Sequence, residues 1–277
     1  MTATIPARCY RRAVIAGLAG WTDDEVRQAT LEAPGRAFVP MPDLEVVERP
    51  GWLQLIAPRF RDGGLNGVWR SILADDDADA VIAATIATYA ARDLRFRWVV
   101  APDSRPLDLA ERLTRHGLQG EPGRGMACAT ASPAITAATI ADGITIERVD
   151  LDSVTIFDHV MGAGWEIDPA PFAHYHRALL TDPDRASSLY LARWQGEPAA
   201  TAAQMRIGRS TYLIGGVVLP AFRGHGLYRA LVVTRLREAA AAGLALAVTH
   251  ARVATSAPIL ERLGFSTVAE VTSFRNR

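Results

Sequence analysis

The stretch TYLIGGVVLPAFRGHGLYRALVVTRLR, from Thr211 to Arg237, decides the fold. Its first part is a β-branched and apolar run that predicts a strand, interrupted only by Gly215–Gly216. Pro220 cannot donate a backbone hydrogen bond to a sheet, so it closes this strand. The short polar turn Arg223–Gly226 then leads into a helix with apolar residues on one face. The pattern therefore predicts a strand, a turn and a helix in immediate succession.

A junction of this kind has the chemistry of an anion-binding site. The start of a helix leaves backbone N–H groups without partners and carries the positive end of the helix dipole. Glycines in the turn let the backbone approach a phosphate closely. Gly216 indicates a bulge or splay that frees main-chain groups for an extended ligand. Many such junctions bind nothing, however, so the junction alone leaves its function open.

The remainder of the chain narrows the possible functions of this junction. Leu244–Ala251 predicts a second strand, Thr255–Pro258 begins a short helix that ends in Leu-Gly-Phe, and Ser266–Phe274 predicts a last strand. This order, with its Arg-x-x-Gly turn and closing ILERLGF, resembles the GNAT (GCN5-related N-acetyltransferase) superfamily over roughly residues 143–277. The resemblance implies an α/β fold, a mostly antiparallel mixed sheet flanked by helices, and acyl transfer from a thioester.

The first half of the chain echoes the second. The segment RFRWVVAP…ERLTRHGL, within 95–118, has the same order of strand, loop, helix, glycine and apolar residue as 244–265. We therefore predict two tandem GNAT-like domains, residues 1–130 and 143–277, with residues 131–142 as a linker. A chance match between common α/β elements is the alternative.

The N-terminal copy is expected to be degenerate. PRFRDGGL (Pro58–Leu65) mimics PAFRGHGL (Pro220–Leu227), but Asn66–Leu73 continues as a strand rather than a helix, so we interpret this segment as a turn. This copy would then be structural or would shape the substrate site.

The other elements expected in the first half are a helix in 8–19, a second helix with a capping box at Thr22–Glu25 and a break at Pro34–Gly35, strands at 44–48, 52–57, 68–73 and 96–101, and helices at 78–92 and 106–116. The acidic residues Asp75–Asp77 are interpreted as favouring the start of a helix rather than as a metal site.

Composition excludes several other classes of function. The 277 residues carry 30 acidic and 30 basic side chains, which gives no support for a nucleic acid or an anionic membrane as the main partner. Cys9 and Cys128 stand far apart without ligand-spaced companions, so we expect neither a disulfide nor a metal. No apolar run is long enough to span a bilayer, and a reducing, cytoplasmic location is expected.

The resemblance assigns the thioester-binding residues by their position in the family pattern. Strand backbone at Gly216, Val217 and Val218 is expected to hydrogen-bond the pantetheine arm, and the phosphate cradle comprises Arg223, Gly224, His225, Gly226, Leu227, Tyr228 and Arg229. The family usually has a small residue where Tyr228 stands. Its bulk would crowd a pyrophosphate, and a phosphopantetheine arm on an acyl carrier protein would tolerate this better. Acetyl-CoA or another acyl-CoA and an acyl carrier protein therefore both remain open as donors.

The candidate catalytic residues follow from two family positions that lack their usual residue, and from a histidine and a serine that could move protons. The usual tyrosine acid of the family is replaced by Leu260, and Ala254 stands where the family has an asparagine. His250 ends a strand next to the expected thioester, and the ordinary histidine pKa near 6.5 suits a general base; a polar residue that merely ends the strand is the alternative. Ser256 is a candidate proton donor to the thiolate, with helix capping as its alternative role.

Three further residues are expected at the acceptor pocket. They are Trp165, His174 and His176. The two histidines would diverge on a helix and not act as a pair.

The sequence therefore predicts an acyltransferase in which a small-molecule amine attacks the thioester directly. A non-catalytic acyl-CoA-binding or regulatory module and a GNAT-fold thioester decarboxylase are the alternatives. The acceptor, the acyl group and the oligomeric state stay open.

Overall fold

The computed structural model describes residue 15, residues 18–183 and residues 186–276 of the chain. Most of the helix expected in 8–19 lies outside these residues. Among the described helices, none is long and apolar enough to cross a membrane.

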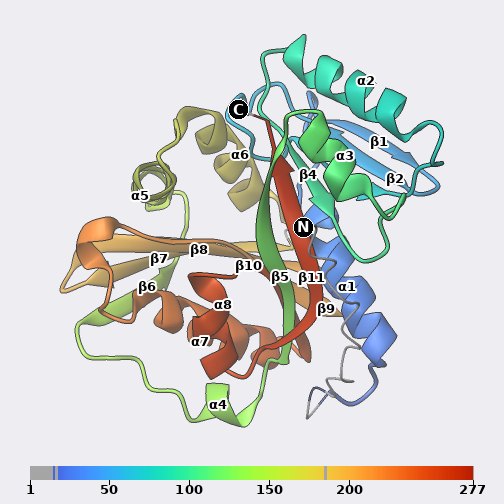
Figure 1. The fold of residues 1–277 in the computed structure, drawn as a ribbon. Coiled ribbons are helices and arrows are strands. Elements are labelled where there is room, and N and C mark those ends of the chain that lie inside the picture. The colour runs from blue at the N-terminus through green and yellow to red at the C-terminus, as the bar shows by residue number, and fades with distance from the viewer. Residues whose placement is uncertain (1–14, 16–17, 184–185, 277) are drawn as a thin grey trace.

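Eleven strands form one continuous mixed sheet in the order β1-β2-β3-β4-β11-β5-β10-β9-β8-β7-β6 (Figure 1). The strands are β1 (Glu45–Arg49), β2 (Trp52–Ile56), β3 (Gly67–Ser71), β4 (Arg97–Val100), β5 (Gln119–Ala129), β6 (Ile144–Arg148), β7 (Ser187–Trp194), β8 (Glu197–Ile207), β9 (Ser210–Val218), β10 (Leu246–Arg252) and β11 (Ser266–Arg275). The pairs β3–β4 and β9–β10 are parallel and the other neighbours are antiparallel. The predicted α/β fold is confirmed, and each half contributes one parallel pair.

The two halves exchange their last strands. Strand β5 of the first half lies between β10 and β11, while β11 of the second half lies between β4 and β5. Figure 1 shows β5 and β11 running side by side through the centre of the molecule, where they pair from Ser266↔Ala127 to Arg275↔Gln119. The division at 1–130, 131–142 and 143–277 stays a prediction, because the sheet crosses it without interruption. The expected linker contains a short helix, Pro133–Thr136.

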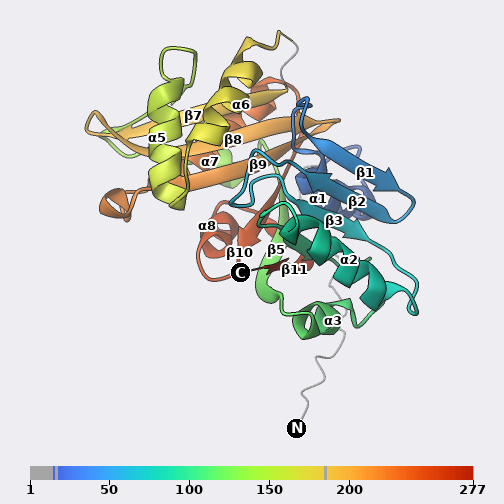
Figure 2. The same ribbon diagram turned by 90° about the horizontal axis from the view of Figure 1, so that it is seen from above.

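Helices cover both faces of the sheet (Figure 2). They are α1 (Asp23–Arg36), α2 (Ala78–Ala90), α3 (Leu109–Arg115), α4 (Pro133–Thr136), α5 (Val154–Trp165), α6 (Ala170–Thr181), α7 (Leu227–Ala241) and α8 (Ser256–Arg262), with a 3-10 turn at Pro220–Phe222. Helices α1, α5 and α6 pack on one face, and α2, α3, α7 and α8 pack on the other. We refer to these as the α1 face and the α7 face.

Helix α1 crosses the seam between the halves. Thr22 and Glu25 form the predicted capping box. The predicted break at Pro34–Gly35 is wrong, because the helix continues to Arg36. Gly35 lies where a Cβ atom would come within 2.6 Å of Leu53, so the last turn packs tightly against the first half of the sheet.

The β3–α2 connection takes the place in the first half that the Arg223–Gly226 turn takes in the second. Pro58–Leu65 forms turns and β3 follows it, as expected. Asp77 precedes α2 but makes no side-chain capping hydrogen bond, and Asp75 instead pairs with Arg112. Carboxylates at this position repel phosphate, which agrees with a degenerate first copy.

Candidate active site

Strand β9 carries a bulge at Gly215–Gly216. The register with β8 shifts between Thr201 and Ala203, so that the two glycines face a single β8 residue, and Gly215 has φ of +66°. A left-handed residue at such a bulge favours glycine. The bulge predicted from the sequence is therefore present.

Strands β9 and β10 separate in front of this bulge. Their parallel pairing runs from Leu246↔Ser210 to Val248↔Tyr212, and no further pair joins them in the described part of the chain. The Thr249 hydroxyl donates to the Leu213 carbonyl at 2.8 Å, just beyond the last pair. The apex of a V-shaped opening thus lies at Tyr212 and Val248.

The turn before α7 presents a row of free amides. Gly224 and Gly226 have φ of +88° and +84°, and the helix has no side-chain cap. Among the described residues, the backbone N–H groups of residues 224–229 have no hydrogen-bond partner. A Cβ atom at either glycine would meet nothing within 4 Å, so the turn is open. This arrangement fits a phosphate group.

The polar side chains of the turn are already engaged. Arg223 donates to the Val218 carbonyl at 3.3 Å, and Arg229 donates to the Thr139 carbonyl at 2.5 Å. The His225 ring stacks on Trp194 with centroids 4.3 Å apart. The main chain of the turn, rather than these side chains, therefore offers the free donors.

Tyr228 points along β9 rather than into the turn. Its Cε2 atom lies 2.9 Å from the place where Gly216 would carry a Cβ atom. Burial raises the pKa of the Tyr228 phenol, while the charge of Arg235 and the contact with Ser256 act in the opposite direction. The phenol is therefore neutral at pH 7 and lies beside the opening, next to the hydroxyl of Ser256.

Arg235 supports the bulge from the α7 face. The side chain is 1% exposed and donates to the carbonyls of Leu231, at 3.0 Å, and Ala203, at 2.8 Å. Burial lowers its pKa to about 10, so it still carries a charge at pH 7. A buried cation is costly unless its donors are satisfied. Here backbone carbonyls satisfy them, and the charge lies close to Tyr228.

His250 is held by the first half of the chain. Its Nε2 atom lies 3.1 Å from the Thr30 carbonyl of α1. That carbonyl is free because its helical partner would be residue 34, and Pro34 has no N–H group. Because a carbonyl only accepts, Nε2 carries the proton and Nδ1 is left as the acceptor. Burial lowers the pKa of His250 to about 4, so the ring is neutral at pH 7 and less basic than an ordinary histidine.

Ser256 has a structural contact in addition to its position beside Tyr228. Its hydroxyl accepts from the Arg252 backbone N–H at 2.9 Å, across the loop that precedes α8. The hydroxyl proton remains available for donation.

The three residues expected at the acceptor pocket have different surroundings. His174 is exposed, whereas His176 is buried and its Nδ1 atom lies 2.5 Å from Asp158 of α5. Trp165 ends α5 and is 38% exposed, with Arg252 at 5.6 Å from its ring. His176 thus holds α5 and α6 together, and Trp165 stands at the mouth of the opening, where β10 ends.

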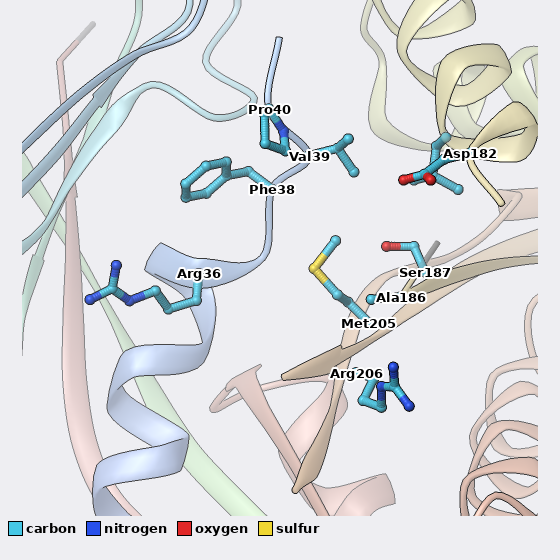
Figure 3. Close-up of a pocket in the computed structure, with 10 residues that line it drawn as sticks. Arg36, Phe38, Val39, Pro40, Asp182, Ala186, Ser187, Met205 and Arg206 are labelled. Carbon is cyan, nitrogen blue, oxygen red and sulfur yellow. The ribbon is translucent and has the colours of Figure 1, made fainter. Parts of the chain in front are cut away.

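A cavity of about 250 Å³ lies on the α1 face, between the end of α1, α6 and the β7–β8 pair (Figure 3). Figure 3 shows Met205 facing its centre and Arg36 pointing away from it. Arg36 instead forms an ion pair with Glu48. The buried Ser187 hydroxyl in its wall has no partner among the described residues. Met205 pairs with Tyr212, so the cavity begins one strand from the apex.

Comparison with known proteins identifies the architecture. Residues 155–247 match the family model of an acetyltransferase (GNAT) domain. A GCN5-related N-acetyltransferase from Kribbella flavida has 19% identity and a TM-score of 0.65, over 93% of this chain and 96% of that one. A tandem GNAT protein from the clavulanic acid biosynthesis pathway has 14% identity and a TM-score of 0.57, over 89% of this chain and 87% of that one. The chain is a tandem GNAT-fold protein.

A functionally unknown conserved protein from Staphylococcus epidermidis has a similar fold, with 11% identity and a TM-score of 0.65, over 86% of this chain and 95% of that one. None of the curated proteins compared with the chain matches it significantly. The GNAT match supports acyl transfer as the class of reaction.

Sequence reasoning misses two contributors to the candidate site, Arg235 and Thr30, and gives a third residue, Tyr228, a different position. Arg235 stands in the helix pattern as one of several arginines, and nothing local marks it as buried. Thr30 contributes a backbone carbonyl, for which the signal was Pro34, four residues later. The sequence places Tyr228 in the phosphate turn. It cannot show that the side chain points along β9 instead, because this direction depends on the space left by Gly216.

Proposed function

We propose that the protein is an acyl-CoA-dependent N-acyltransferase whose C-terminal half carries the reaction. The observation that carries this proposal is the row of free amides at residues 224–229, which adjoins the opening between β9 and β10. A thioester carrier with its phosphates on these amides would extend its arm along Gly216, Val217 and Val218 toward the apex. The Leu227–Arg229 turn of α7 supplies the positive end of the helix dipole.

The chemistry requires two proton movements. The amine nitrogen of the acceptor bonds to the thioester carbonyl carbon, and the carbon–sulfur bond then breaks. We assign to Nδ1 of His250 the proton lost by the amine, received directly or through one water. With a pKa of about 4 this base is weak, so the acceptor must arrive as the free amine or lose its proton as the carbon–nitrogen bond forms.

The departing thiolate needs a donor. We assign this role to the Tyr228 phenol, with Ser256 beside it, because the usual family position holds Leu260. The charge of the buried Arg235 favours the phenolate left behind. Tyr228 thus replaces the missing acid from a different helix.

The direction of Tyr228 also bears on the donor. Its ring lies against Gly216 and leaves the turn at residues 224–229 open, so a full CoA pyrophosphate has room there. We therefore prefer acyl-CoA and retain an acyl carrier protein as the second donor to test. The small-molecule amine would approach from the α1 face, near Trp165 and the cavity beside Met205.

We assign the first half a supporting role. It has carboxylates where the second half has free amides, yet its α1 helix orients His250. Residues 1–130 would thus shape the acceptor side, with 131–142 as the connection to the catalytic half, 143–277.

A donor screen tests the proposal. The full chain is incubated with acetyl-CoA, longer acyl-CoAs or acyl carrier proteins and a mixed amine pool, and N-acylated products are identified by mass spectrometry. We expect acylated amine and free CoA in equal amounts. Thioester binding without any product would instead establish a regulatory module, and release of carbon dioxide from malonyl-CoA without an acceptor would establish a decarboxylase.

A further inference from the structure

Arginine side chains gather on the α1 face where the exchanged strands meet. Arg252 of β10 and Arg275 of β11 share one carboxylate, Glu121 of β5, at 3.3 and 3.8 Å. Arg97 of β4 lies near all three, close enough that their charges influence its pKa. The cluster thus holds three guanidinium groups and one carboxylate, and its excess charge is positive.

Arg97 is the unusual member of this cluster. No carboxylate lies within ion-pair distance of it among the described residues, and its Cζ atom lies 5.5 Å from the centre of the Trp69 ring. Burial, followed by the charge of Arg275, lowers the pKa of Arg97 to about 10, although the side chain remains only half-buried. A desolvated cation that is repelled by its neighbours costs stability unless an anion joins it.

The surroundings of Arg97 offer space and further donors. Arg97 and Arg275 line a cavity of about 140 Å³ together with Arg95, Asn276 and one acidic residue, Asp62. On neighbouring positions of the same face, the buried Trp69 Nε1 and Ser273 Oγ atoms have no partner in the described part of the chain. Unsatisfied buried donors of this kind call for an explanation, and an absent ligand is one.

The cluster adjoins the site of acyl transfer. The charge of Arg97 acts on Tyr212, at the apex of the opening between β9 and β10, and on His250, two residues beyond Val248 on β10. At the other side of the cluster, Arg252 lies 5.6 Å from the Trp165 ring at the mouth of the opening. A molecule with its amine at the apex would therefore have its remaining groups within reach of Arg97.

Resting on the proposed function, we infer that the acceptor is an amine that also carries an anionic group, a carboxylate or a phosphate, and that Arg97, flanked by Arg252 and Arg275, binds that group. A guanidinium fork matches the two oxygens of a carboxylate or phosphate. The same three arginines would repel polycationic amines. The first half of the chain, which supplies Arg97, thereby selects the substrate.

Product binding tests the inference without requiring turnover. Ligand-detected NMR is recorded on the full chain with a pool of N-acetyl amino acids, with the matching pool of N-acetyl amino acid amides, and with N-acetyl-O-phosphoethanolamine. We expect binding of acids or of the phosphate ester but not of the uncharged amides. A preference for the acids over the amides would indicate a carboxylate as the recognised group, and binding of the phosphate ester would indicate a phosphate.

Variants locate the site. Arg97→Gln should weaken binding of the anionic ligand about tenfold to hundredfold, the value of a charge-assisted hydrogen bond, and Arg97→Lys should lose less. The exposed Arg115→Gln is the matched control and should bind as the wild type does. Acetyl-CoA affinity, measured separately by calorimetry, should not change in any of them.

Three results would overturn the inference: no preference for the acids or for the phosphate ester over the amides, an Arg97→Gln variant that binds like wild type, or an Arg97→Gln variant that loses acetyl-CoA instead. Failure of the wild type to bind acetyl-CoA would count against the proposed function, whereas selective binding of the anionic products would still support the arginine site.

Discussion

Replacing Gly226 by alanine should separate thioester binding from folding. Gly226 has φ of +84° at the start of α7, and a Cβ atom there would meet nothing within 4 Å. The substitution therefore adds only the conformational cost of a left-handed alanine, about 1–2 kcal/mol. For a chain of this size, that cost corresponds to a fall in Tm of roughly 2–8 °C.

The loss of acetyl-CoA affinity in Gly226→Ala should be larger than this conformational cost alone suggests. Relief of the strain would turn the amides of residues 224–229 away from their common direction. Loss of one charge-assisted hydrogen bond costs about 1.5–3 kcal/mol, so the Kd for acetyl-CoA should rise about tenfold to hundredfold.

Gly243 provides the matched control at the other end of the same helix. It has φ of +76°, and a Cβ atom there also meets nothing within 4 Å. Gly243→Ala should lower the Tm as much as Gly226→Ala but leave the Kd unchanged. Thermal unfolding and isothermal titration of acetyl-CoA measure the two quantities. If both folded variants bound acetyl-CoA equally well, the free amides of the turn would not be the phosphate site.

Three other predictions concern titratable groups. Lowering the pH from 6.5 to 4 should reduce the free energy of unfolding by at most about 3 kcal/mol through His250, whose native pKa is about 4. The unfolded chain is favoured because its histidine, with an ordinary pKa, binds the proton first. Urea titrations should show that this contribution to the pH dependence vanishes in His250→Asn. Asp158→Ala should lower the free energy of unfolding by about 3–5 kcal/mol, since it leaves His176 buried and unpaired, and the double leucine variant of this pair should be closer to wild type. Tyr228→Phe should lower kcat about 10²-fold or more without changing Tm or the KM for acetyl-CoA, and an unchanged kcat would exclude the phenol as the acid.

Features set by local chemistry could be predicted from the sequence. The capping box at Thr22 and Glu25 needs only residues three apart, and the bulge at Gly215–Gly216 needs only a glycine pair inside an apolar run. The free amides before α7 follow from glycines at a helix start. In each case the residues that determine the feature also form it.

Features that join distant segments could not be predicted in this way. Strand β5 was missed because its first half, QGEPGRG, has the composition of a loop, and it is extended because β10 and β11 pair with it on both sides. The pKa of His250 depends on burial under α1, more than two hundred residues earlier in the chain. Arg97 lies on β4 and the apex on β9 and β10, so their proximity depends on the order in which distant strands pair.

The strand exchange explains why a first half without a phosphate site is retained. Strand β5 pairs with all of β10, from Leu246↔Ala129 to Arg252↔Gly123, and so holds the strand that carries His250. In return, β11 pairs with β4 and places Arg275 beside Arg97. Without β11, β4 of the first parallel pair would be an edge strand, and without β5, β10 of the second parallel pair would be an edge strand. In the proposed reaction, a first half without an anion cradle would therefore still contribute to the acceptor side of the site in the second half.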